Sequence, residues 1–315
     1  MTIGPDGGLW FGEMNKIGHI TPTGKLTEFP AHLVTSPIVS GSDNNLWFVE
    51  MDAQGDSVLV RMSPDGNRDV MKRGLVGPPT PITAGPDGNI WVAGGTGPEG
   101  ESNPTYYTIL KITPAGEMTS YSLPRPSQTL PGTLPGWGVS LISGADGAIW
   151  FLENVSLANA PTKQALLLGS ITPSGTIKLA PVEVDRGTAP STSQGDELKG
   201  AITAGPDGNL WFMRHDGQIG RITPSGVITW FQVPGQTVQE LPIITKGADG
   251  NLWFSAQPGK LGRITPTGDV KLLPLPAQTQ VGGLAATSDH HLWFLNAAET
   301  PTGSVWWVHI GRLTI

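Results

Sequence analysis

The chain of 315 residues contains no cysteine, which excludes disulfides, thiol catalysis and cysteine-ligated zinc or iron–sulfur sites. Charged residues make up only 14% of the chain, the net charge is −7, and no run of Lys or Arg occurs. We therefore expect no nucleic-acid partner, because such proteins neutralise phosphates with clustered basic side chains. No apolar stretch approaches the length of about 20 residues that spans a membrane, so we expect no membrane partner either.

The first residues lack the basic and apolar segments of a secretory signal peptide. This leaves the localisation open between the cytosol and export with the signal removed. A phosphate-binding loop and a serine-hydrolase elbow are also missing from the sequence.

Glycine and proline are abundant, with 43 and 29 residues. This composition is typical of many short strands joined by tight turns, and it argues against a helical protein. The apolar residues are spread evenly along the chain, which argues against a long disordered segment.

One short phrase, Asp-Gly-Asn-Leu-Trp-Phe with small variations, organises the whole chain. It occurs seven times, at Asp6–Phe11, Asp43–Phe48, Asp87–Val92, Asp146–Phe151, Asp207–Phe212, Asp249–Phe254 and Asp289–Phe294. The Asp-Gly part is typical of a tight turn, and the Leu-Trp-Phe part predicts a strand with apolar side chains on both faces. Such a strand is expected where sheets pack against it from both sides.

Each repeat reads as four strands, A to D. In the fifth repeat these are Gly200–Ala204, Leu210–Met213, Gln218–Ile222 and Val227–Val233. Because repeats of this kind share one continuous core, we predict an all-β fold, a seven-bladed β-propeller of four-stranded antiparallel blades. Residues 1–315 are predicted to form this single domain.

The A–B and C–D turns hardly change between repeats, whereas the B–C and D–A loops vary widely in length. Long examples are Gly94–Thr105, Arg125–Gly136, Asn154–Gln164 and Val184–Lys199. Both variable loops lie at the same end of an antiparallel blade. We therefore expect a site for a small molecule, peptide or glycan at this end, at the mouth of the propeller channel.

The sequence begins in strand A of the first repeat and ends, at Gly311–Ile315, in strand C of the seventh. The last blade therefore has three strands, with Ser304–Leu313 at its edge, or a strand outside this sequence completes it. An unpaired edge that carries Trp306 and Trp307 predicts association with another strand.

The phrases Ile-Thr-Ala-Gly-Pro-Asp-Gly-Asn-Leu-Trp-Phe and Ile-Gly-Arg-Ile-Thr-Pro-x-Gly closely resemble the repeat of the virginiamycin B lyase (streptogramin lyase) family. The resemblance extends over all seven repeats and implies a seven-bladed propeller. The known family enzymes open streptogramin B depsipeptides by an elimination at the ester, without water and with the help of Mg²⁺.

The family's catalytic residues are not matched in this chain. Its two histidines, in Pro-His-x-Ile phrases at strand A of the last two blades, fall on Pro242 and Gly282. Its glutamate falls near Asn296 or Ala297, and its tyrosine would precede Met1. An elimination needs a base at the substrate proton and a metal or donor at the developing charge. The resemblance therefore supports the fold and argues against this lyase chemistry.

Three carboxylates occupy equivalent positions at the end of strand B: Glu13, Glu50 and Glu153. Oxygen ligands suit a hard cation, so they are candidate ligands of Mg²⁺ or Ca²⁺. The alternative is that they are remnants of the repeat, solvated or paired with a nearby Lys or Arg. Arg214 and His215 occupy the same place in the fifth blade. His215 is a candidate general base, which Asp196 and Glu197 would orient, or else an exposed loop residue.

Other candidates lie in the variable loops. His32 belongs to the D–A loop before the second blade, and Tyr106, Tyr107 and Trp137 fall in or beside the long loops of the third blade. Aromatic side chains at such a place either stack on a ligand or hold the loops onto the scaffold. Two functions stay open: a ligand- or partner-binding propeller, and a divergent metal-dependent lyase or hydrolase of a cyclic ester or lactone.

Overall fold

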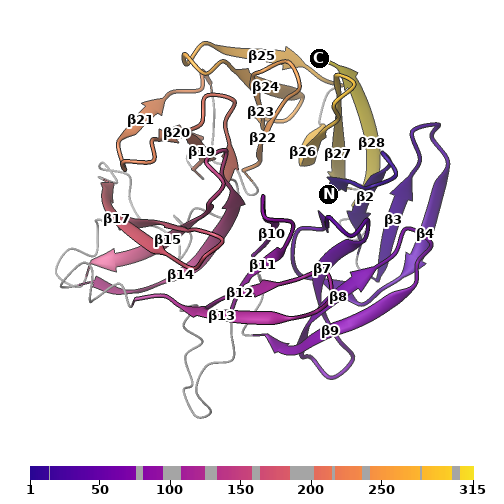
Figure 1. The fold of residues 1–315 in the computed structure, drawn as a ribbon. Coiled ribbons are helices and arrows are strands. Elements are labelled where there is room, and N and C mark those ends of the chain that lie inside the picture. The colour runs from indigo at the N-terminus through magenta and orange to yellow at the C-terminus, as the bar shows by residue number, and fades with distance from the viewer. Residues whose placement is uncertain are drawn as a thin grey trace. The chain divides into compact units, whose positions relative to one another are not determined.

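The computed structural model describes residues 1–13, 15–75, 81–94, 108–124, 133–157, 164–184, 202–214, 217–235, 242–276, 279–299 and 306–315. Its secondary structure in these residues consists of antiparallel strands (Figure 1). The sheets confirm the predicted all-β fold, a seven-bladed β-propeller. In the described residues no helix has the length and apolar character needed to cross a membrane.

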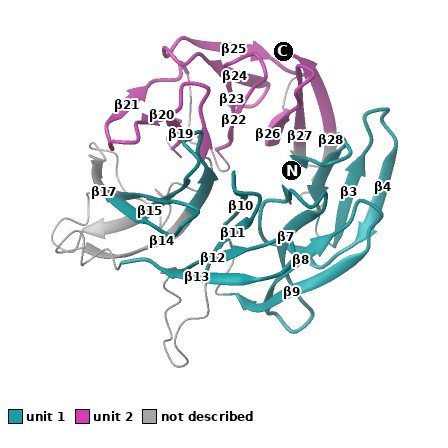
Figure 2. Ribbon diagram, viewed as in Figure 1, with its two compact units in different colours: residues 1–187 teal, residues 188–315 magenta. Residues whose placement is uncertain are grey.

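The chain divides into two compact units, residues 1–187 and 188–315 (Figure 2). The prediction that residues 1–315 form a single domain stays a prediction. Each unit is described here by itself.

The first unit contains four blades. Blade 1 consists of β1 (Thr2–Ile3), β2 (Leu9–Gly12), β3 (Lys16–Ile20) and β4 (Leu26–Pro30). Blade 2 consists of β5 (Leu33–Val34), β6 (Val39–Ser40), β7 (Leu46–Met51), β8 (Ser57–Met62) and β9 (Arg68–Leu75). Blade 3 consists of β10 (Ile82–Ala84), β11 (Ile90–Ala93), β12 (Thr108–Ile112) and β13 (Met118–Ser122). Blade 4 consists of β14 (Thr133–Ser143), β15 (Ile149–Leu157), β16 (Gln164–Ile171) and β17 (Ile177–Val184).

The second unit contains three blades. Blade 5 consists of β18 (Ile202–Ala204), β19 (Leu210–Met213), β20 (Ile219–Ile222) and β21 (Ile228–Phe231). Blade 6 consists of β22 (Ile244–Lys246), β23 (Leu252–Ser255), β24 (Lys260–Ile264) and β25 (Val270–Pro274). Blade 7 consists of β26 (Gln280–Ala286), β27 (His291–Glu299) and β28 (Trp306–Thr314), so the prediction of a three-stranded last blade is confirmed.

Blade 2 differs from the predicted four strands, because its strand A is split into β5 and β6, which both pair with β7. Pro37 lies between the two pieces and has no N–H to donate to the ladder. The neighbouring Ser36 hydroxyl accepts the N–H of Val49 at 2.7 Å. At the break a side chain therefore supplies the acceptor that a backbone carbonyl provides in a continuous ladder.

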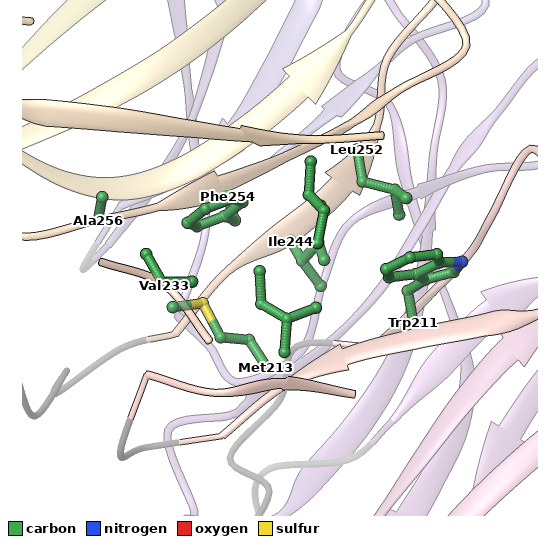
Figure 3. Packing of buried hydrophobic residues seen from close by; sticks show 9 residues of the cluster. Trp211, Met213, Val233, Ile244, Leu252, Phe254 and Ala256 are labelled. Carbon is green, nitrogen blue, oxygen red and sulfur yellow. The ribbon is translucent and has the colours of Figure 1, made fainter. Parts of the chain in front are cut away.

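Buried apolar clusters join consecutive blades within each unit. The cluster in Figure 3 combines Trp211 and Met213 from β19 with Leu252 and Phe254 from β23, and it lies between blades 5 and 6. Comparable clusters join blades 1 and 2, 2 and 3, 3 and 4, and 6 and 7. The Leu-Trp-Phe part of strand B is buried in blades 1 to 6, as its sequence predicted, whereas Trp293 and Phe294 of blade 7 are only partly buried.

The repeated Asp is a hydrogen-bond acceptor for the Trp four residues later. The indole Nε1 donates to the carboxylate Oδ1 at 3.0–3.1 Å in Trp10–Asp6, Trp47–Asp43, Trp91–Asp87, Trp150–Asp146, Trp211–Asp207 and Trp253–Asp249. The bond satisfies the N–H of a core Trp and fixes the A–B turn against strand B.

A basic residue of strand C links a blade to its successor. In each case it donates to the proline carbonyl of the next C–D turn, in Arg61 Nη1–Pro114 O (3.0 Å), Lys111 Nζ–Pro173 O (2.9 Å) and Arg221 Nη1–Pro266 O (2.9 Å). Blade 1 has His19 here, which stacks on Trp10 with ring centroids 4.0 Å apart and places Nε2 2.6 Å from the Asp6 carboxylate. His19 is therefore a core residue.

The turn carboxylates give the fold a defined response to acid. Burial acts to raise the pKa of Asp87, Asp207 and Asp249, but hydrogen bonds from the following Asn side chain and the Trp indole outweigh it and lower the pKa below the ordinary 3.8. A carboxyl whose pKa is lowered by folding stabilises the native state above its unfolded pKa. That stability is lost as the pH falls through the lower, native value.

We expect Asp207→Asn to be less stable than the parent at neutral pH and to lose less stability as the pH falls from the ordinary Asp pKa of 3.8 through the lower pKa of the native carboxyl. Thermal melts at several pH values measure this difference. Asp65→Asn, in an exposed C–D turn, is the matched control and should follow the parent. Parallel pH profiles for Asp207→Asn and the parent would contradict the assignment.

Candidate functional site

A pocket of about 210 Å³ lies against the β7–β8–β9 part of blade 2 and reaches its loop-rich end. Its lining consists of two acidic, two basic, three aliphatic residues and one histidine: Glu50, Asp52, Arg68, Arg73, Val58, Val60, Val70 and His32. Two residues that the sequence singled out for separate reasons, His32 and Glu50, are brought together here.

Glu50 is the deepest charge in the pocket, with 2% of its side chain exposed. One carboxylate oxygen accepts the backbone N–H of His32 at 3.1 Å, and the other forms an ion pair with Arg68 Nη2. A buried carboxylate needs such partners, because desolvation of an unpaired charge costs several kcal/mol. For Glu50 the structure thus shows the pairing with an Arg that we considered as the alternative to metal binding.

Arg68 begins β9 opposite Met62, and its side chain extends along the sheet toward the other end of the blade. The guanidinium carbon lies 5.9 Å from the Phe48 ring centroid, and Nη1 donates to the carbonyl of Pro30 at 3.1 Å. Three contacts therefore hold the group in place: an aromatic face, a backbone carbonyl of blade 1 and the Glu50 carboxylate.

Asp52 and Arg73 form a second ion pair, at 2.5 Å, at the rim of the pocket. Asp52 Oδ1 also accepts the backbone N–H groups of Gln54 and Asp56, each at 3.0 Å. Burial acts to raise the pKa of Asp52, but these two backbone donors and then Arg73 outweigh it and lower the pKa. The carboxylate is fixed to its own turn, whereas 61% of the Arg73 side chain is exposed.

The other two carboxylates do not join Glu50 in a described cluster. Glu13 follows β2 as a partly exposed residue whose N–H donates to the Lys16 carbonyl at 2.8 Å. Glu153 lies in β15 opposite Val139, and its side chain is outside the described part of the structure. Among the described residues, no group of three His, Asp or Glu side chains is placed to hold a metal ion. The predicted metal site therefore stays a prediction.

Arg214 follows β19, as expected. Its guanidinium carbon lies 5.3 Å from the Trp230 ring centroid, and Nη1 is 3.3 Å from Gln218 Oε1. Of the remaining candidates, His215, Tyr106 and Tyr107 fall outside the described residues. Trp137 lies in β14, but its side chain is not described.

The sequence analysis missed Arg68, Arg73 and Asp52. None of them belongs to a repeated motif, and the two arginines lie on strand D, whose side chains vary between repeats. The charge pattern of this blade was a usable signal. Glu50 and Asp52 lie two positions apart on the B–C hairpin, and Arg68 and Arg73, with which they pair, lie on the outer strand.

The places where the resemblance puts three of the family's catalytic residues lie in blades 6 and 7. Gly282 lies in β26 at an irregularity of the ladder between Val281 and Gly283. Asn296, in β27, accepts the backbone N–H of Gln280 at 2.9 Å through Oδ1. Pro242, before β22, is buried. These three residues supply no side-chain base.

Comparisons with known proteins agree with the repeat. The model of the virginiamycin B lyase family matches residues 1–196 and 188–310. A catalytically inactive histidine-to-alanine variant of virginiamycin B lyase from Staphylococcus aureus, crystallised with quinupristin, is 26% identical. The alignment covers 99% of this chain and 93% of that one, with a TM-score of 0.65.

A streptogramin B lyase structure is 27% identical, with coverage of 93% of this chain and 88% of that one and a TM-score of 0.63. The WD40 propeller domain of Doa1, 12% identical, covers 89% of this chain and 86% of its own with a TM-score of 0.52, and supports the fold alone. A search of curated proteins gave no match.

Proposed function

Because the chain belongs to the virginiamycin B lyase family, we propose that it is a ligand-binding propeller that does not perform the family's elimination. One observation carries the proposal: Pro242 and Gly282 stand where the family's two histidines are expected. Neither residue has a group that can take a proton from a substrate, and an elimination requires one.

The relative with quinupristin supports the same separation of binding from catalysis. In that protein a histidine is replaced by alanine, the variant is catalytically inactive, and the crystal was grown with quinupristin. The ligand that we propose for this chain is a small molecule, peptide or glycan at the loop-rich ends of the blades. Cyclic depsipeptides are the first class to test.

Quinupristin tests the proposal directly. We expect calorimetry to detect binding, with a dissociation constant of about 1 mM or below. We expect chromatography with mass detection to find the compound unchanged after prolonged incubation with Mg²⁺. Virginiamycin B lyase from Staphylococcus aureus, incubated in parallel, is the positive control for turnover.

The products distinguish the alternatives. Elimination opens the ring without adding atoms, so the product has the mass of the substrate and a new retention time, whereas hydrolysis adds one water. Either product, if it disappears when a chelator removes Mg²⁺, would replace our proposal with a metal-dependent enzyme. Glu13, Glu50, Glu153 and His215 would then be the residues to vary. Absence of both binding and product would refute ligand binding for this class.

A further inference from the structure

The pocket of blade 2 has its acceptors occupied and its donors in excess. Glu50 receives two hydrogen bonds, one on each oxygen, from His32 and Arg68. Asp52 receives three, two from its own turn and one from Arg73. Each of the four carboxylate oxygens already accepts a hydrogen bond, and only 2% of the Glu50 side chain and 8% of the Asp52 side chain are exposed, so these two residues have little to offer a cationic ligand.

The two guanidinium groups, by contrast, have hydrogen-bond donors that the protein does not use. Each carries five N–H donors. Arg68 uses one toward Pro30 and one toward Glu50, and its Nε is buried without a hydrogen-bond partner. Arg73 makes one hydrogen bond, to Asp52, and is largely exposed. The unused hydrogen-bonding capacity of this pocket is therefore that of a donor with positive charge.

Apart from His32, the rest of the lining is aliphatic. Val58 and Val60 are buried in β8, and Val70 in β9 is 48% exposed. A volume of about 210 Å³ is below the usual range of about 300–1,000 Å³ for sites that enclose a drug-sized ligand. It suits a compact group with a branched aliphatic part, which would cover the exposed Val70 and leave its charged end with the arginines.

We propose that this pocket binds a small organic carboxylate with a short aliphatic body. Guanidinium groups recognise carboxylates through paired, charge-assisted hydrogen bonds. A bare phosphate would satisfy the donors but would leave Val70 uncovered. This inference specifies a ligand for the loop-rich end of blade 2, and it therefore rests on the proposed function.

The carboxylate has two sources, a free small acid or the C-terminus of a peptide. Isovalerate and acetate therefore represent a free acid, and N-acetylvalinate and acetyl-glycyl-valine represent a peptide C-terminus. Isovaleramide is the uncharged control, and inorganic phosphate is the anion without an aliphatic part. We expect isovalerate to bind at least tenfold more tightly than isovaleramide, because the amide lacks the charge. We expect about two of its three additional carbons to be buried, which should give about 15-fold over acetate at roughly 0.8 kcal/mol per buried methylene.

Two variants of adjacent residues on β9 locate the binding. Arg73→Gln removes a donor that lines the pocket, and Lys72→Gln removes the same charge from a residue outside the lining. We expect the dissociation constant for isovalerate, measured by ligand-observed NMR, to rise about tenfold in Arg73→Gln and to stay within twofold in Lys72→Gln. Val70→Ser should raise the dissociation constant about threefold for isovalerate and by less for acetate.

The inference is overturned by any of three results: equal affinity for isovalerate and isovaleramide, equal losses in Arg73→Gln and Lys72→Gln, or no binding of any carboxylate up to about 10 mM, a free energy near −2.7 kcal/mol. The quinupristin experiment on the same preparations separates the two proposals. Quinupristin binding without carboxylate binding refutes the pocket assignment alone, whereas carboxylate binding without quinupristin binding refutes the depsipeptide class alone.

Discussion

Trp211→Ala is expected to lower the free energy of unfolding by about 3–5 kcal/mol, the usual cost of removing a large aromatic side chain from a core. Trp211 is fully buried in the cluster that joins blades 5 and 6 (Figure 3). Its ring stacks on Phe231 at 5.3 Å and lies 5.7 Å from the Arg221 guanidinium, while its N–H satisfies Asp207. The substitution removes the packing, the cation contact and the hydrogen bond together.

Urea titration followed by circular dichroism measures this loss. Trp230→Ala is the matched control, because Trp230 belongs to the same blade but is only partly buried in β21. We expect its cost to be less than half of that of Trp211→Ala. Equal losses in the two variants would show that aromatic area in general, and not the joint between the blades, sets the stability.

The second large effect is expected at the buried ion pair. Arg68→Met should lower the free energy of unfolding by about 3 kcal/mol, because it leaves the Glu50 charge buried without its cationic partner. We use the lower end of the usual range because 25% of the Arg68 side chain is exposed. Methionine keeps much of the contact with Phe48, so the loss reports on the charge.

The double variant Glu50→Gln/Arg68→Met separates the charge from the packing. Replacing both members removes the uncompensated charge, and the stability should return to within about 1 kcal/mol of the parent. A double variant that is as unstable as Arg68→Met alone would show that the guanidinium acts through Pro30 and the aromatic ring, and not through Glu50.

The repeat made the architecture predictable from the sequence. Asp and Trp four residues apart predict a turn and a buried strand. The same Trp–Asp hydrogen bond forms in each of the first six blades, from Trp10–Asp6 to Trp253–Asp249. For the last blade the sequence allowed three strands or completion by a strand outside it, and the structure shows β26, β27 and β28. The split of strand A in blade 2 was not predicted, although Pro37 gives its physical reason, because a proline near a strand end is also compatible with a loop.

The pocket was much less predictable. Glu50 and His32 were named for different reasons, and their contact depends on the path of a loop. The pairing of Glu50 with Arg68 could not be predicted from the strand register, because Arg68 lies opposite Met62 whereas Glu50 lies opposite Val58. Only a long side chain that follows the sheet joins them. Strand periodicity predicts which face a residue occupies, but not how far an arginine extends along that face.

The links between blades have a consequence for how such a chain is able to change its length in evolution. Blade 3 carries both halves of such a joint, because Lys111 on its strand C donates to the Pro173 carbonyl of blade 4 and the Pro114 carbonyl in its C–D turn accepts from Arg61 of blade 2. A gene duplication that inserts a repeat of this kind therefore brings a matching donor and acceptor with it. Gain or loss of such a repeat leaves the neighbouring donor and acceptor able to pair, whereas an insertion inside a repeat must be accommodated by its loops.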